Sequence, residues 1–173
     1  MNSVIHMQNS LLMGWRCASC GELITRIEDG WVEWLAAEDD YGTTTVSGLR
    51  LVHRLAFNSR DSERNRCRYD DRREFQQDHS LVEGLPLDRF VGADGLMLLL
   101  SFLAEGDMPT EELLELVKRV HIPGYEQTRE LFDEAIHGGA IAPLIGEGFY
   151  MQSEIHDLLR WVSGDVTAEF ARR

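Results

Sequence analysis

The sequence predicts an α+β protein, with a small β module in its first half and a mainly helical second half. Cys17 and Cys20 are separated by two residues and lie just before two segments rich in strand-forming side chains. From Leu85 onward the apolar residues recur at helical spacing instead. Along the 173 residues we expect a flexible arm over 1–13, the β module over 14–70, a linker over 71–84, a helical domain over 85–163 and a tail over 164–173.

Two strands are expected to form a hairpin beside the cysteines. Residues 30–36 are rich in strand formers and alternate in polarity, which is the pattern of a half-buried strand. Residues 49–57 are the expected returning strand, and the polar stretch between the two is the turn. Because Trp31 and Trp34 fall on opposite faces, we expect one in the core and the other exposed, where it could stack on a base or anchor a partner.

The Cys17-x-x-Cys20 pair followed by Gly21 is typical of a metal-binding knuckle. Two cysteines at this spacing can reach one zinc ion from a tight turn, and glycine accepts the positive φ that such a turn imposes. A redox pair is the alternative, but it normally opens a helix within a βαβ unit, whereas this segment runs toward a strand. We therefore expect both cysteines to bind a metal ion.

The remaining ligands must come from elsewhere in the chain. His53, in the returning strand, and Cys67 are the expected third and fourth ligands, with His79 in reserve. A Cys-x-x-Cys knuckle that shares an ion with a β-hairpin resembles the zinc-ribbon and treble-clef modules, and the resemblance covers residues 15–70. Since four protein ligands leave no open coordination position, we expect the Zn²⁺ to be structural.

Charge is unevenly distributed along this acidic chain, whose formal net charge is −13. Residues 54–73 carry seven arginines against four acids, a local charge of +3, whereas residues 85–173 carry seven bases against sixteen acids, or −9. Arg66 and Arg68 flank Cys67 and would favour its thiolate, so a reactive cysteine is the alternative to ligation. The net charge disfavours nucleic acid as a partner but leaves it open for the basic segment.

The helical half is expected to contain four helices and a short hairpin. Asp94 is the expected cap of an apolar helix that would be buried on all sides. The later elements are helices over 110–120 and 125–136, a hairpin over 140–150 and a last helix over 155–162. The order of three helices and a hairpin resembles a winged helix, with 125–136 in the recognition position.

That recognition helix is too acidic to bind DNA readily. Arg129 is its one base, against the acids Glu126, Glu130, Asp133 and Glu134, which would repel phosphates. We therefore expect a partner protein. The candidate partner-binding residues are Glu126, Arg129, Glu130, Asp133, Arg66, Arg68, Trp31 and Trp34. A phage-type acidic inhibitor that mimics DNA and a winged-helix or zinc-dependent DNA-binding regulator remain alternatives.

The sequence offers no clear catalytic constellation. Asp78 and His79 downstream of a knuckle resemble the HNH nucleases, but no asparagine follows Asn65. Signatures of zinc deaminases, zinc proteases, phosphate-binding loops and serine hydrolases are absent. The first residues lack the basic start typical of a signal peptide, and the longest apolar run is far shorter than the roughly 20 residues of a membrane span, so we expect neither. We expect a non-enzymatic, cytoplasmic protein.

Overall fold

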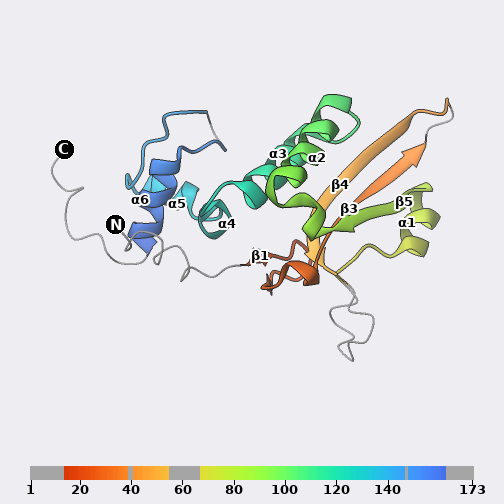
Figure 1. Ribbon diagram of the computed structural model, residues 1–173, viewed down its shortest axis with the longest axis horizontal. Coiled ribbons are helices and arrows are strands. Elements are labelled where there is room, and N and C mark those ends of the chain that lie inside the picture. Colours follow the sequence, from red (N-terminus) through yellow and green to blue (C-terminus); the bar gives the residue numbers. More distant parts are fainter. Residues whose placement is uncertain (1–13, 39–40, 55–66, 147, 163–173) are drawn as a thin grey trace. The chain divides into compact units, whose positions relative to one another are not determined.

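The computed structural model describes residues 14–38, 41–54, 67–146 and 148–162. The chain forms two compact units that divide between His121 and Ile122 (Figure 1). The expected arm over 1–13, the tail over 164–173 and Arg66 lie outside the described residues. Antiparallel strands and helices occur together, which confirms the α+β class.

The first unit is built around a three-stranded antiparallel sheet with the order β4-β3-β5 (Figure 1). The strands are β3 (Gly30–Glu38), β4 (Thr44–His53) and β5 (Leu81–Pro86). β3 and β4 form the predicted hairpin, but β4 begins at Thr44 rather than Leu49. The β-branched side chains of Thr44, Thr45 and Val46 favour this longer strand.

The central strand β3 is buried on both faces. Val32, Trp34 and Ala36 point to one face and lie in the core. Glu33 points to the opposite face, and yet none of its surface is exposed. Its carboxylate accepts the backbone N–H of Tyr69, so the segment that follows Cys67 covers this side of the sheet.

The two tryptophans of β3 differ as the sequence predicts, although Trp31 is less exposed than expected. Trp34 is buried, meets the ring of Phe102 edge-on at 6.1 Å and donates from Nε1 to Glu83 (3.0 Å). Trp31 is half-buried, and the guanidinium groups of Arg54 and Arg68 lie 5.6 and 4.7 Å from its ring centroid. Trp31 therefore already stacks with side chains of its own unit.

A second, two-stranded sheet carries the cysteine knuckle. It pairs β1 (Trp15–Arg16) with β2 (Leu23–Ile24) in antiparallel register, and a 3-10 turn, η2 (Ile27–Asp29), leads from it into β3. The indole of Trp15 donates to the carbonyl of Arg119 (3.3 Å), whose guanidinium donates to the carbonyl of Arg16 (2.6 Å). These two bonds fix β1 to the end of α3 (Thr110–His121).

Residues 71–84, where the sequence predicts a linker, instead form helix α1 (Asp71–Asp78) and most of β5. Asp70 caps α1 by accepting the N–H groups of Arg72 and Arg73. Gly84 allows β5 to pair closely with β3, because a Cβ there would lie 2.5 Å from both Trp31 Nε1 and the carbonyl oxygen of Val32. Short-range capping and a close strand contact thus order a segment that has few apolar residues.

Two helices complete the first unit. After the 3-10 turn η4 (Leu87–Phe90), α2 (Gly92–Glu105) and α3 pack together, and α3 also covers β4. Asp94 lies in the first turn of α2 rather than at its N-cap. Contrary to the sequence expectation, α2 is not buried on all sides, because Met97, Leu100 and Leu103 are exposed. No described helix combines the length and apolarity needed to cross a membrane.

The second unit packs three helices around a small apolar core. The helices are α4 (Tyr125–Thr128), α5 (Phe132–His137) and α6 (Gln152–Val162). Its buried hydrophobic residues are Tyr125, Phe132, Ala135, Ile141, Ile155 and Leu158. The rings of Phe132 and Tyr150 stack with centroids 3.5 Å apart.

The structure differs from the predicted winged-helix order in three ways. The single helix expected over 125–136 is divided into α4 and α5, and between them the N–H of Leu131 bonds to the carbonyl of Thr128, three residues back, in a tighter 3-10 turn (2.8 Å). The described residues of the expected hairpin over 140–150 contain no strand. The helices α2 and α3, expected in the same domain, belong to the first unit.

Candidate metal centre

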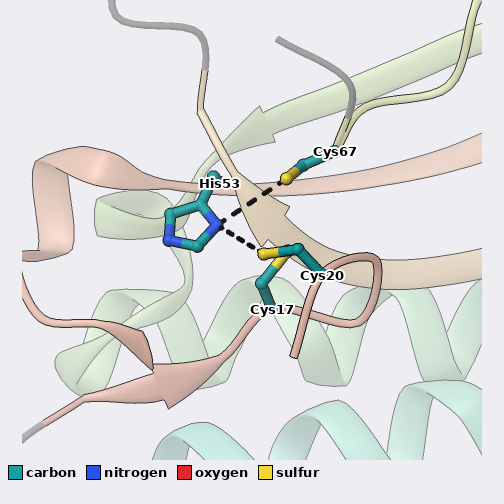
Figure 2. A group of neighbouring side chains, drawn as sticks. All are labelled: Cys17, Cys20, His53 and Cys67. Carbon is teal, nitrogen blue, oxygen red and sulfur yellow. Dashed lines mark hydrogen bonds between the residues drawn. The ribbon is translucent and has the colours of Figure 1, made fainter. Parts of the chain in front are cut away.

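The first two candidate ligands lie on the turn between β1 and β2. Cys17 follows β1 directly; its N–H donates to the carbonyl of Glu22 (2.9 Å), and its own carbonyl accepts the N–H of Gly21 (3.0 Å). Gly21 has a φ of +76°, which confirms the positive φ expected of a knuckle turn. The turn brings the thiols of Cys17 and Cys20 close to each other and to the other two candidate ligands, His53 and Cys67 (Figure 2).

The third candidate ligand, His53, is the last residue of β4. A hydrogen bond from the N–H of Ala18 to the carbonyl of Leu51 (2.8 Å) connects the knuckle to this strand. Leu51 lies two residues before His53. His53 Nε2 lies 3.4 Å from the carbonyl oxygen of Leu23. With its proton on Nε2, His53 would donate to this carbonyl and direct the lone pair of Nδ1 toward the cysteines.

The fourth candidate ligand, Cys67, is positioned by a charged network around Glu33. Arg50 donates from Nε and Nη2 to Glu33 Oε1 (2.9 and 2.8 Å), and Nη2 also donates to the carbonyl of Cys67 (3.2 Å). Arg68 Nε donates to Glu33 Oε2 (3.3 Å), and the N–H of Tyr69 donates to Oε1 (3.0 Å). The buried carboxylate and its arginines therefore fix the backbone at Cys67 and in the two residues that follow it.

The four candidate ligand atoms lie close enough together to share one metal ion. The Sγ atoms of Cys17, Cys20 and Cys67 and one ring nitrogen of His53 all lie within 4.8 Å of one another. His53 Nδ1 is 3.4 Å from Cys20 Sγ and 3.8 Å from Cys67 Sγ (Figure 2). Zinc–sulfur and zinc–nitrogen bonds of about 2.3 and 2.0 Å imply tetrahedral edges of about 3.5–3.8 Å, so this cluster could bind a metal ion.

The two buried cysteines differ in acidity as thiols. Burial raises the pKa of Cys17, but hydrogen bonds from the backbone at Cys20 and Ser19 outweigh it and lower the pKa from 9.0 to about 7. Burial, together with the hydrogen bond to Cys20 and the charge of Cys17, raises the pKa of Cys67 to about 12. The flanking arginine expected to lower this pKa does not do so, because Arg68 is directed to Glu33. A bound cation would deprotonate both thiols.

The reserve ligand His79 lies outside this cluster. It ends α1 with a φ of 62°, is exposed, and its ring packs on Phe75 with centroids 5.2 Å apart. The neighbouring Asp78 accepts the N–H of Ser80 (3.0 Å). Hydrogen bonds from the side chain and then the backbone of Ser80 lower the pKa of Asp78. The Asp78–His79 pair that resembles a nuclease motif therefore forms a helix end and a turn.

The candidate partner-binding residues are spread over both units. In the second unit Glu126 is buried and pairs with Arg129, whereas Glu130 and Asp133 are exposed. In the first unit Arg68 pairs with Glu33, and both tryptophans take part in contacts within the unit. Glu130 is exposed but also pairs with Arg129 (3.2 Å), whose guanidinium thus lies between two acids of the set.

Sequence reasoning missed the supporting residues Glu33 and Arg50. An acid within a strand of alternating polarity predicts a solvated face, and only the tertiary fold reveals that residues 67–69 cover it. The directly opposed positions of Glu33 and Arg50 on β3 and β4 are the signal that could have found the pair, once the hairpin register is known.

Comparison of the chain with protein-family models, with curated proteins and with solved structures gives no match.

Proposed function

We propose that Cys17, Cys20, His53 and Cys67 bind one structural Zn²⁺, which holds the first unit in a shape that binds a partner protein. The observation that carries this proposal is the mutual spacing of the four ligand atoms, all within 4.8 Å. Three thiolates with one imidazole are a usual ligand set for structural zinc. Magnesium and calcium prefer oxygen ligands, which this cluster lacks.

A metal site with four protein ligands has no open coordination position and therefore is not catalytic. Its tetrahedral shell leaves no position for a water molecule or a substrate, so the ion would neither activate a nucleophile nor polarise a carbonyl group. Cys17, His53 and Cys67 are buried, and Cys20 alone among the ligands is exposed. The binding free energy of such an ion is coupled to folding, which suits a stabilising role.

The exposed face of α2 is the surface that we propose for the partner. Met97, Leu100 and Leu103 are 65%, 45% and 37% exposed. Met97 and Leu100 share one side of the helix with Ala93 and Ala104, which are also exposed, at the spacing i, i+4, i+7 and i+11. We call Ala93, Met97, Leu100, Leu103 and Ala104 the α2 stripe. Contiguous apolar surface of this kind is typical of protein–protein contacts.

The charges beside the α2 stripe indicate the chemistry of the partner. Asp94, Ser101 and Glu105 follow one border of the stripe and are exposed. Together with the net charge of −13, they favour an apolar contact surface bordered by lysine or arginine, as on a basic amphipathic helix. The same charges repel nucleic acid, so a protein fits this surface better than DNA.

Elemental analysis of the purified protein tests the metal half of the proposal. We expect one zinc per chain in the parent and loss of zinc in Cys17→Ser, Cys67→Ser and His53→Ala. His79→Ala is the matched control, because His79 lies outside the cluster, and it should retain the metal. A parent without stoichiometric metal would contradict the proposal.

A titration with a fluorescent amphipathic Leu/Lys helix peptide tests the partner half. Met97→Lys should weaken binding about tenfold or more, because it places a like charge within the contact. Leu144→Lys is the control: Leu144 is 80% exposed but lies in the second unit. An equal loss of peptide affinity in the two variants would indicate non-specific binding to exposed apolar side chains and overturn the α2 assignment.

A further inference from the structure

A polar pocket of about 660 Å³ lies beside the metal centre, between the knuckle, β4 and α1. Three of its lining residues are arginines from different parts of the chain: Arg50 on β4, Arg68 after the fourth ligand, and Arg73 on α1. Ser19 on the knuckle and Gln77 on α1 add neutral donors. The pocket thus collects hydrogen-bond donors from several directions.

The arginines of this pocket retain unused donors. Arg68 bonds to Glu33 only through Nε, and no described residue accepts a bond from its two Nη groups. Arg50 uses Nε and Nη2 for Glu33 and Cys67, while its Nη1 has no acceptor within the described ranges. These unbonded nitrogens of Arg50 and Arg68 are not fully buried, so a ligand could reach them.

Two of the arginines are also held rigidly. The side chains of Arg50 and Arg68 are each 24% exposed and share the fully buried carboxylate of Glu33. The guanidinium of Arg50 lies 3.4 Å from the ring centroid of Tyr69, and that of Arg68 lies 4.7 Å from that of Trp31. Because their planes are fixed in advance, little side-chain entropy would be lost when they bind an anion.

We propose that this pocket binds a phosphoryl group. Donors that converge from three chain segments suit a tetrahedral oxyanion better than a planar carboxylate, which a single arginine can satisfy. Glu33 neutralises one arginine, and Asp70 and Glu74 also line the pocket. Asp70 already caps α1 through Oδ1. The two lining acids suit a phosphate carried by a molecule whose hydroxyl groups can donate to them.

Amide shifts followed by NMR during a titration with inorganic phosphate test this site. We expect saturable shifts centred on Ser19, Arg73 and Gln77. Arg73→Gln should weaken phosphate binding about tenfold or more, the range for loss of one charged hydrogen-bonding partner. Arg72→Gln is the matched control, because Arg72 neighbours Arg73 on the same exposed helix but does not line the pocket. Arg73 is exposed, so neither change should unfold the protein.

Two results would overturn the proposal. One is the absence of saturable shifts up to about 10 mM phosphate, beyond the millimolar range of weak specific sites. The other is an equal loss in Arg73→Gln and Arg72→Gln, which would indicate diffuse attraction to the helix. Parallel titrations with adenosine monophosphate and with a short single-stranded oligonucleotide identify the source of the phosphate. The chain's charge of −13 predicts tighter binding of the mononucleotide.

Discussion

The two units of the chain build their interiors from different groups. The first unit buries three candidate metal ligands, Cys17, His53 and Cys67, together with the carboxylate of Glu33. The second unit has a core of six apolar side chains and also buries Glu126, Thr128 and Glu154. Buried polar and charged groups cost free energy unless they are paired. The first unit therefore depends on specific partners, with a metal ion proposed among them, whereas the second depends mainly on apolar packing and on local hydrogen bonds.

The buried carboxylates sharpen this contrast. Glu33 is paired with the guanidinium groups of Arg50 and Arg68, so its burial is offset by charge. Glu154 instead accepts the backbone N–H groups of Leu144 (2.8 Å) and Met151 (2.6 Å), and so closes the loop before α6. The Glu33 carboxylate supports the candidate metal centre, whereas the Glu154 carboxylate closes a loop in the segment where the sequence predicts a hairpin.

Metal removal should produce the largest difference between the units. Structural zinc contributes roughly 10–16 kcal/mol in small zinc modules, which is comparable to the whole stability of many domains. We expect a strong chelator to unfold the first unit, while the amide signals of the second unit persist in a two-dimensional NMR spectrum. Survival of the β3 and β4 signals after complete metal removal would contradict the proposed dependence of the first unit on the metal.

Phe132→Ala should have the next largest effect, confined to the second unit. Phe132 is buried and stacks on Tyr150, and truncation of a buried phenylalanine costs about 3–5 kcal/mol. Urea unfolding followed by NMR should show early loss of the second unit, with an unchanged zinc content. Leu144→Ala is the control, since truncation of this exposed side chain should change stability by less than about 0.5 kcal/mol.

Glu33→Gln should destabilise the first unit by about 2–3 kcal/mol, because two arginines lose their buried counter-charge. The amide oxygen can still accept the N–H of Tyr69, so the shape of the site is retained. We also expect weaker zinc binding in a chelator competition, as Cys67 is less firmly positioned. An unchanged zinc affinity would mean that Glu33 stabilises the sheet without supporting the metal centre.

Glu154→Gln should have the smallest effect of the four, about 1–2 kcal/mol, because it weakens two hydrogen bonds to one loop. Hydrogen exchange should accelerate at the amides of Leu144 and Met151 and remain unchanged in the first unit. A global loss of stability as large as that of Glu33→Gln would contradict the distinction drawn between the two carboxylates.

The sequence predicts those features that depend on neighbouring residues. The spacing of Cys17 and Cys20, the following Gly21 and the strand-forming residues of β3 and β4 are enough to predict the knuckle and the hairpin. His53 and Cys67 follow from the small number of cysteines and histidines that lie near them in the chain. All four candidate ligands are brought together in the structure.

The features that sequence reasoning misses depend on tertiary contacts. β5 becomes a strand because Gly84 fits against β3, which no local pattern reveals. The all-round apolar composition of α2 predicts burial, whereas the fold leaves Met97 and Leu100 exposed. The single helix expected over 125–136 is interrupted after Thr128 by a tighter turn between Thr128 and Leu131, which the spacing of the apolar residues does not reveal.

X-ray absorption at the zinc edge tests the central claim most directly, because it measures the ligands of the ion in the purified protein. We predict a first shell of three sulfur atoms at about 2.3 Å and one nitrogen atom at about 2.0 Å. His53→Ala should remove the nitrogen contribution, and His79→Ala should leave it intact. A shell with two or fewer sulfur atoms, or one completed by oxygen, would contradict the closed four-ligand site.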